Sequence, residues 1–115
     1  MPRKFYMPPE HERVLQILRH CRGRHQAITN AQLAELSGVP ERRCRHIVKE
    51  LIELFGEPIG TAYGHPGGHY LIASQEERRE TVEALAGHAK SILRRMGRLD
   101  RQAARRLLGQ LELEL

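Results

Sequence analysis

The chain has 115 residues, enough for one domain with a modest core and too few for several large domains. Aliphatic residues dominate the apolar 40%, with no Trp and two Phe, so helices are favoured over an aromatic-rich β-sandwich. The 19 Lys and Arg outweigh the 14 Asp and Glu by a net +5, which suits a polyanionic partner but is also common in domains that are merely soluble.

The first residues and the cysteines give no sign of export. Residues 1–9 (MPRKFYMPP) are a basic arm without the apolar stretch of a signal peptide, and no run of 18 apolar residues predicts a membrane span. Cys21 and Cys44 lie far apart, which favours two small core residues over a disulfide framework or a zinc knuckle. We therefore expect a cytoplasmic protein with no membrane contact.

Residues 10–22 are predicted to form the first helix, because apolar side chains recur there at helical spacing. The prolines at positions 8 and 9 suit its first turn, and Gly23 offers a stop. The apolar positions are Val14, Leu15, Ile17, Leu18 and Cys21.

A second helix is predicted over residues 30–37. Thr29 and Gln32 stand at the spacing of a capping box, in which each side chain accepts a hydrogen bond from the other residue's backbone N–H. Gly38 can adopt a left-handed backbone conformation, which ends this helix and sends the next one across it.

Residues 40–55 are predicted to form a third helix whose two faces differ sharply. Steps of about 100° per residue place the apolar side chains in one stripe and the cations on the opposite side. The apolar stripe holds Cys44, Ile47, Val48, Leu51 and Phe55. The cationic face holds Arg42, Arg45, His46 and Lys49, with Arg43 on its flank. The expected core consists of Leu33, Leu36, Val39, Ile47, Val48 and Leu51.

The stretch AYGHPGGHY (residues 62–70) is predicted to be the tip of a hairpin between strands that read IGTA and HYLIA. It contains neither the GxxxxGK[ST] of a phosphate-binding P-loop nor a GxGxxG that opens a helix. His65 and His69 supply only half of a tetrahedral zinc site, so we expect no metal. Gly67 and Gly68 permit a tight reversal and let a backbone N–H approach a phosphate.

Residues 75–115 are predicted to form a helical tail that serves as a dimerisation element. Ser74 and Glu77 repeat the capping-box spacing, and apolar residues then alternate at the intervals of a coiled-coil seam. Gly97 is a candidate end for this helix, and Asp100 is a candidate cap for a last one. The seam holds Val82, Leu85, Ala89, Ile92, Met96 and Leu99. The alternative is a helical hairpin within a monomer.

The predicted elements follow the order of a winged helix-turn-helix domain: helix, short strand, helix, glycine turn, cationic helix and hairpin. The segment LAELSGVPERRCRHIVKELIELFGEPI, followed by GGHYLIAS, resembles the winged-helix domains of bacterial and phage DNA-binding regulators, including the amino-terminal domain of biotin repressors. It is more similar to a group of small phage-type winged-helix proteins, in which the hairpin leads into a helical tail. The resemblance covers residues 10–74 and departs from the pattern at Pro40, where many of these domains carry a Ser or Thr cap.

The resemblance implies that the third helix enters the major groove of double-stranded DNA, with the hairpin tip beside the adjoining groove or backbone. The residues expected to contact DNA are Arg42, Arg43, Arg45, His46 and Lys49 of the helix, His65, Gly67, Gly68 and His69 of the tip, and Arg3 and Lys4 of the arm. Two alternatives stay open: a solvated helix face paired with Glu41, Glu50 and Glu53, and a disordered arm.

The predicted fold is mainly α with a small β-hairpin, organised as a basic arm (1–9), a winged helix-turn-helix domain (10–74) and a helical tail (75–115). No nucleophile motif or acid–base pair stands out, so we expect no enzyme, no cofactor and no small-molecule substrate. The expected function is sequence-specific binding of double-stranded DNA, in transcriptional regulation or in phage or other mobile-element functions. The alternative is a winged-helix adaptor for protein contact, replication or packaging.

Overall fold

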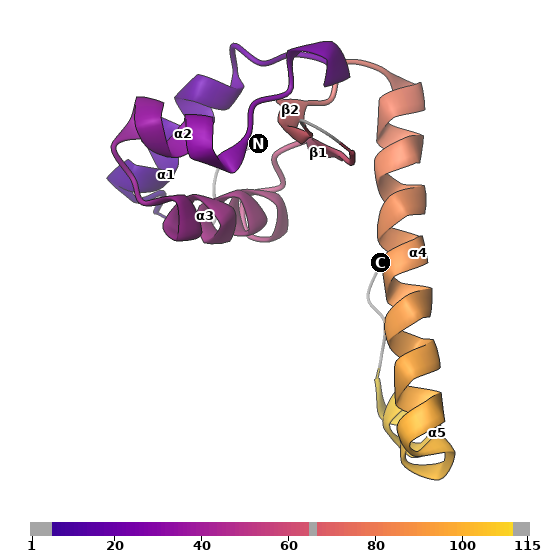
Figure 1. Cartoon of the computed structure of the whole chain (residues 1–115). Coiled ribbons are helices and arrows are strands. Elements are labelled where there is room, and N and C mark those ends of the chain that lie inside the picture. Colours follow the sequence, from indigo (N-terminus) through magenta and orange to yellow (C-terminus); the bar gives the residue numbers. More distant parts are fainter. Residues whose placement is uncertain (1–5, 65–66, 112–115) are drawn as a thin grey trace. The chain divides into compact units, whose positions relative to one another are not determined.

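The computed structural model describes residues 6–64 and 67–111, which Figure 1 traces. Within these ranges the chain is mainly helical with one two-stranded antiparallel sheet, as predicted. The elements in chain order are α1 (Pro9–Leu18), the 3-10 helix η1 (Arg24–Gln26), α2 (Asn30–Ser37), α3 (Glu41–Glu53), β1 (Ile59–Ala62), β2 (Gly68–Leu71), α4 (Gln75–Leu99) and α5 (Arg101–Gln110). The chain divides into two compact units, Met1–Thr81 and Val82–Leu115, so α4 contributes to both.

α1 ends earlier than the sequence predicts, at Leu18 instead of Arg22. The helix ends here because backbone groups of the residues that follow it form hydrogen bonds to the hairpin. The carbonyl oxygen of Cys21 accepts a hydrogen bond from the N–H of Leu71 (2.8 Å), and the N–H of Gly23 donates to the carbonyl oxygen of Leu71 (2.8 Å). The apolar spacing continues through Cys21, so periodicity alone could not reveal this pairing.

The predicted bounds and caps of α2 are confirmed. The Thr29 hydroxyl accepts from the N–H of Gln32 (3.1 Å), and the Gln32 side chain accepts from the N–H of Thr29 (2.9 Å). Gly38 follows the helix with φ 75° and ψ 10°, the left-handed conformation that only glycine adopts without strain. The chain can therefore turn at once from α2 into α3.

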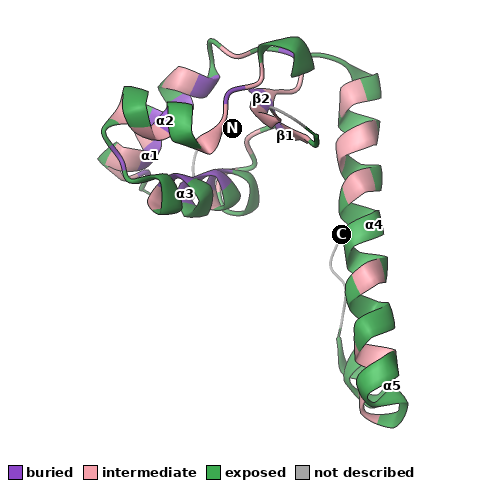
Figure 2. Cartoon of the chain, in the orientation of Figure 1, coloured by how far each residue is buried: buried purple, intermediate pink, exposed green. Residues whose placement is uncertain are grey.

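The core of the first unit lies where α1, α2 and α3 pack together, and Figure 2 shows its buried residues. Its most buried members, each at most 3% exposed, are Val14, Leu15, Leu18, Leu33, Val39, Cys44, Ile47, Val48, Leu51 and Ile59. Five of the six predicted core residues are among them. The sixth prediction, Leu36, is wrong, because its side chain is 66% exposed.

Leu36 is exposed because α2 turns a different stripe inward. The inward positions are Asn30, Leu33, Ala34 and Ser37, which recur at helical spacing and are buried or half-buried. Leu36 lies about 110° around the helix from the middle of this stripe. The size and apolar character of Leu36 suggested a core residue, but its position on the outer face of α2 leaves it exposed.

β1 and β2 form the predicted hairpin, with Ile59 opposite Leu71 and Ala62 opposite Gly68. β1 is the predicted IGTA, whereas β2 is Gly68–Leu71 instead of the predicted HYLIA. The expected short strand between the first two helices is reduced to two isolated bridges, one between Arg22 and Leu71 and one between Ile28 and His69. Ile28 and His69 exchange two backbone hydrogen bonds of 2.8 Å each, so this bridge fixes the hairpin beside the start of α2.

The predicted cap at Ser74 is half formed, since its hydroxyl accepts from the N–H of Glu77 (3.2 Å) while the Glu77 side chain bonds elsewhere. α4 continues past Gly97 to Leu99, so Gly97 is not its end. Asp100 caps α5 as predicted, accepting from the N–H of Ala103 (2.9 Å). Among residues 82–111 Ala104 is the only buried one, so this part of the second unit lacks a core of its own.

Candidate nucleic-acid interface

α3 has the two opposite faces that its sequence predicts. Cys44, Ile47, Val48 and Leu51 are buried against the other helices, whereas Arg42, Arg45, His46 and Lys49 are exposed. The first turn has no side-chain cap, because Pro40 occupies the cap position. The carbonyl oxygen of Pro40 nevertheless accepts from the N–H of Cys44 (2.9 Å), and Glu41 lies at the positive end of the helix.

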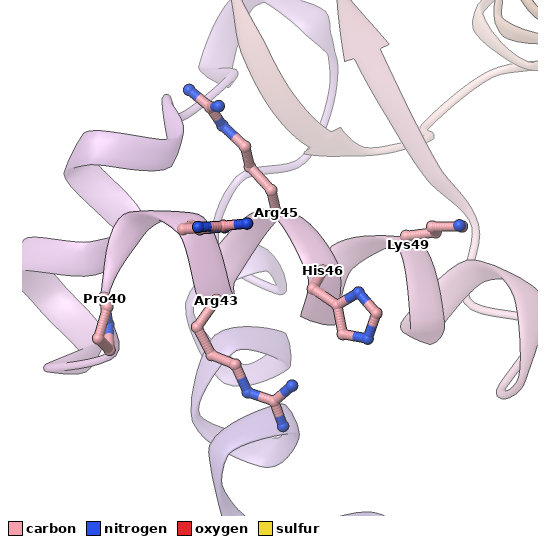
Figure 3. A pocket seen from close by; sticks show the side chains of 6 residues that line it. Pro40, Arg43, Arg45, His46 and Lys49 are labelled. Atoms are coloured by element: carbon pink, nitrogen blue, oxygen red, sulfur yellow. The ribbon is translucent and has the colours of Figure 1, made fainter.

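A hollow of about 650 Å³ runs along the outer side of α3, and we call it the α3 hollow. It is lined by Pro40, Arg42, Arg43, Arg45, His46 and Lys49. Figure 3 shows Arg43 and Arg45 extending from α3 in opposite directions, with His46 and Lys49 further along the helix. In the described part of the chain no carboxylate lines this hollow, so its electrostatic character is cationic.

Three of the cationic side chains have acidic neighbours. A guanidinium nitrogen of Arg45 lies 3.3 Å from Glu41, that of Arg43 lies 3.7 Å from Glu10, and the ring of His46 lies 3.5 Å from Glu50. Exposed pairs of this kind stabilise a protein by only about 0 to 1 kcal/mol, so an anionic ligand can displace them.

Arg42 and Lys49 form no ion pair with any carboxylate that the structure describes. The predicted alternative of a face paired with Glu41, Glu50 and Glu53 thus holds in part, at Arg45 and His46. Arg42, near the start of α3, and Lys49, near its end, therefore remain available to a ligand.

Behind α3, His11 makes a buried contact that the sequence reading missed. Its ring is 3% exposed, and its Nε2–H donates to Oε1 of Glu50 (3.1 Å), which lowers the pKa of that carboxyl group; the nearby His46 lowers it further. The signal was the position of His11 on the apolar stripe of α1, three and four residues before Val14 and Leu15.

His69 lies inside the hairpin base instead of at an open tip. Its Nε2 lies 3.1 Å from the side-chain oxygen of Asn30, and its Nδ1 lies 3.2 Å from the hydroxyl of Thr61. Burial lowers the pKa of His69, and the charge of Arg45 lowers it further, so both effects favour the neutral ring. This placement favours a role in positioning the hairpin over direct contact with a phosphate.

The fold also requires a glycine at position 68. Its φ is 126°, and a Cβ there would overlap the backbone of Ile28, whose carbonyl carbon would lie at 2.6 Å. Gly67 has φ 71° and lies in the tight reversal before β2. Arg3, Lys4 and His65 fall outside the described residues, so their expected DNA contacts stay predictions.

Other kinds of site have little support in the described residues. There, no group of three or more His, Cys, Asp and Glu side chains is placed to hold a metal ion. None of the helices in residues 6–64 and 67–111 combines the length and apolarity that crossing a membrane requires. Comparisons with protein-family models, with curated proteins and with solved structures found no match for this chain.

Proposed function

We propose that this chain is a sequence-specific double-stranded DNA-binding protein of the winged helix-turn-helix class. The observation that carries the proposal is the division of α3 into a buried apolar face and an exposed face of cations over a hollow without described carboxylates. In this proposal α3 enters the major groove, and the β1–β2 hairpin lies beside the adjoining groove or backbone.

The positions of the cations suggest separate roles. Recognition helices contact base edges with residues near their N-terminus, where Arg42 and Arg45 lie. An arginine can donate two hydrogen bonds to O6 and N7 of guanine, whereas a lysine is commonly a point charge beside a phosphate. We assign base contacts to Arg42 and Arg45 and a phosphate contact to Lys49.

We further propose that the protein acts as a homodimer through the tail seam, which we define as Val82, Leu85, Ala89, Ile92, Met96 and Leu99. Four of these side chains, Val82, Leu85, Ile92 and Leu99, are each at least half exposed. A second copy would bury them, and a dimer reads two half-sites about one helical turn of DNA apart. The alternative, a monomer whose α5 covers α4, has less support because Leu107, Leu108 and Leu111 are exposed too.

An electrophoretic shift assay with genomic duplexes at two salt concentrations tests the DNA-binding proposal. We expect Arg42→Ala and Arg45→Ala each to lose about 1 to 3 kcal/mol of binding free energy on the preferred site, and Lys49→Ala to weaken all sequences alike. Arg13→Ala, which removes an exposed arginine of α1, is the matched control and should bind as the wild type does.

Binding that is insensitive to salt would contradict the proposal, because contacts to phosphates release counterions. Absence of binding to any duplex would instead favour an adaptor that contacts other proteins. Exposed apolar side chains of the first unit, Leu36 and Tyr63 among them, would be candidates for such a contact.

A further inference from the structure

The described part of the second unit is strongly cationic. Between residues 82 and 111 the cations are Lys90, Arg94, Arg95, Arg98, Arg101, Arg105 and Arg106, and the anions are Glu83 and Asp100. The expected DNA contacts in α3, the hairpin and the arm include none of these residues. Their arrangement therefore needs an explanation of its own.

Four of these arginines surround one groove of about 350 Å³ between α4 and α5, which we call the arginine groove. Arg94 and Arg98 come from α4, where they are one helical turn apart, and Arg101 and Arg105 come from α5 at the same spacing. Figure 1 shows α5 folding back along the end of α4, which brings the two pairs to the same groove. Leu93 and Ala104 contribute to its apolar lining.

No described carboxylate lines the arginine groove, and none forms an ion pair with its four arginines. Asp100, the nearest acidic residue along the chain, is occupied in capping α5. Four like charges around one groove repel one another, and an anion between them would relieve that repulsion. Arginine stems that merely cover apolar surface would explain the packing, but lysine could serve that purpose equally.

The groove and the tail seam occupy different sides of α4. Steps of about 100° per residue place Arg94 and Arg98 nearly opposite the middle of the seam. A dimer formed through the seam would thus leave the groove open to a ligand.

We propose that the arginine groove binds the phosphodiester backbone of duplex DNA, as a second contact separate from the α3 hollow. Guanidinium groups bind phosphate oxygens through paired hydrogen bonds, which suits a groove whose charged lining residues are all arginines. This inference depends on the proposed function for its ligand. Backbone contacts carry no sequence information, so the groove adds affinity and salt dependence without changing sequence preference.

Fluorescence anisotropy of labelled duplexes across a salt series tests this site in the full chain. The test variants are Arg94→Gln with Arg98→Gln, and Arg101→Gln with Arg105→Gln. The matched control, Lys90→Gln with Arg95→Gln, removes the same charge from α4 outside the groove. Circular dichroism first verifies that every variant keeps the helical content of the wild type.

Each groove variant should reduce the slope of log K against log salt by about 2, because each lost phosphate contact contributes about 0.9. Its ratio of affinities for preferred and scrambled duplexes should stay at the wild-type value. The control should keep a slope close to that of the wild type. An unchanged slope in the groove variants, or an equal loss in the control, would overturn the proposal.

The same experiment separates this inference from the proposed function. If groove variants bind as the wild type while Arg42→Ala loses affinity, the groove assignment fails and the proposed function stands. If only the groove variants lose affinity, the groove assignment stands and the role of α3 fails. Binding to phosphatidylcholine vesicles that contain phosphatidylserine, with no binding to duplex DNA, would reassign the groove to a lipid surface and overturn the DNA proposal.

Discussion

Glu50 illustrates how the buried His11 can act on the surface of α3. It belongs to α3, but its carboxylate accepts from the buried His11 and does not line the α3 hollow. The same carboxylate oxygen also lies 3.5 Å from the ring of His46, so Glu50 connects the buried His11 to the edge of the α3 hollow. His11 is therefore a positioning residue for the proposed interface, although it does not lie on it.

Gly68 gives a prediction at the scale of one residue. In Gly68→Ala the backbone would be strained, because φ is 126° there, and the new Cβ would overlap the backbone of Ile28. We expect the free energy of unfolding, measured by urea denaturation, to fall by about 2 to 4 kcal/mol.

Gly64→Ala is the matched control for this prediction. Gly64 also has a positive φ, 111°, but a Cβ there would meet nothing within 4 Å. Only the backbone strain should appear, at about 1 to 2 kcal/mol. Equal losses in the two variants would show that the contact between β2 and Ile28 does not constrain the hairpin.

At the scale of elements, Glu77 connects the first turn of α4 to η1. Its carboxylate accepts from the N–H of Ala73 (2.8 Å) and from the N–H of Arg24 (2.9 Å), while Arg24 also pairs with Glu80. The hydrogen bond from Ala73 and then that from Arg24 hold the pKa of Glu77 below its ordinary value of 4.5.

This shift predicts how stability depends on pH. Because the folded pKa lies below the unfolded one, the contribution of Glu77 is complete above about pH 4.5 and is lost as the pH falls through the folded pKa. Glu77→Gln should be less stable than the wild type near neutral pH, since one amide oxygen cannot replace two carboxylate acceptors.

Urea denaturation at about pH 7 and about pH 3.5 checks this prediction. The difference in stability between the two pH values should be smaller in Glu77→Gln than in the wild type. Glu76→Gln, at the exposed neighbouring position, should keep the full difference. A wild-type pH dependence in the Glu77 variant would mean that the two hydrogen bonds contribute nothing to acid sensitivity.

Local signals in the sequence predicted much of this fold. The capping box at Thr29, the left-handed Gly38 and the apolar stripe of α3 each depend on residues close together in the chain. For that reason the bounds of α2 and the outward direction of Arg42 and Lys49 could be predicted.

Features set by distant contacts could not be predicted in this way. α1 stops at Leu18 because Leu71 of the hairpin bonds to the residues after it. His69 looked like part of an exposed tip, but Asn30 and Thr61 bind its ring within the fold. The arginine groove was missed because its four arginines come from two helices, and each pair alone looks like a solvated face.

At the scale of the whole molecule, the two units carry different kinds of exposed surface. The first has a formed core and a cationic face on α3, whereas the described part of the second buries only Ala104 and exposes the apolar side chains of the tail seam. This contrast is what we expect if the first unit recognises DNA bases and the second joins two copies and adds backbone contacts.

Sedimentation equilibrium tests the homodimer. The wild type should have twice the mass of the 13.2 kDa chain, and Ile92→Asp should have the mass of one chain because it would leave a carboxylate in the apolar seam. Leu36→Asp places the same charge at an exposed apolar residue outside the tail (66% exposed, against 50% for Ile92) and should leave the mass at the dimer value. A wild type that sediments as a single chain would contradict the dimer.

The central claim is that the exposed face of α3 reads DNA sequence. Selection of bound duplexes from a random pool, carried out with the wild type and with Arg42→Ala, measures this most directly. We predict that the wild type enriches a motif bound about 10³-fold or more tightly than scrambled DNA, and that Arg42→Ala loses discrimination at one position of it. No enriched motif, or the same motif with equal discrimination in both proteins, would contradict the claim.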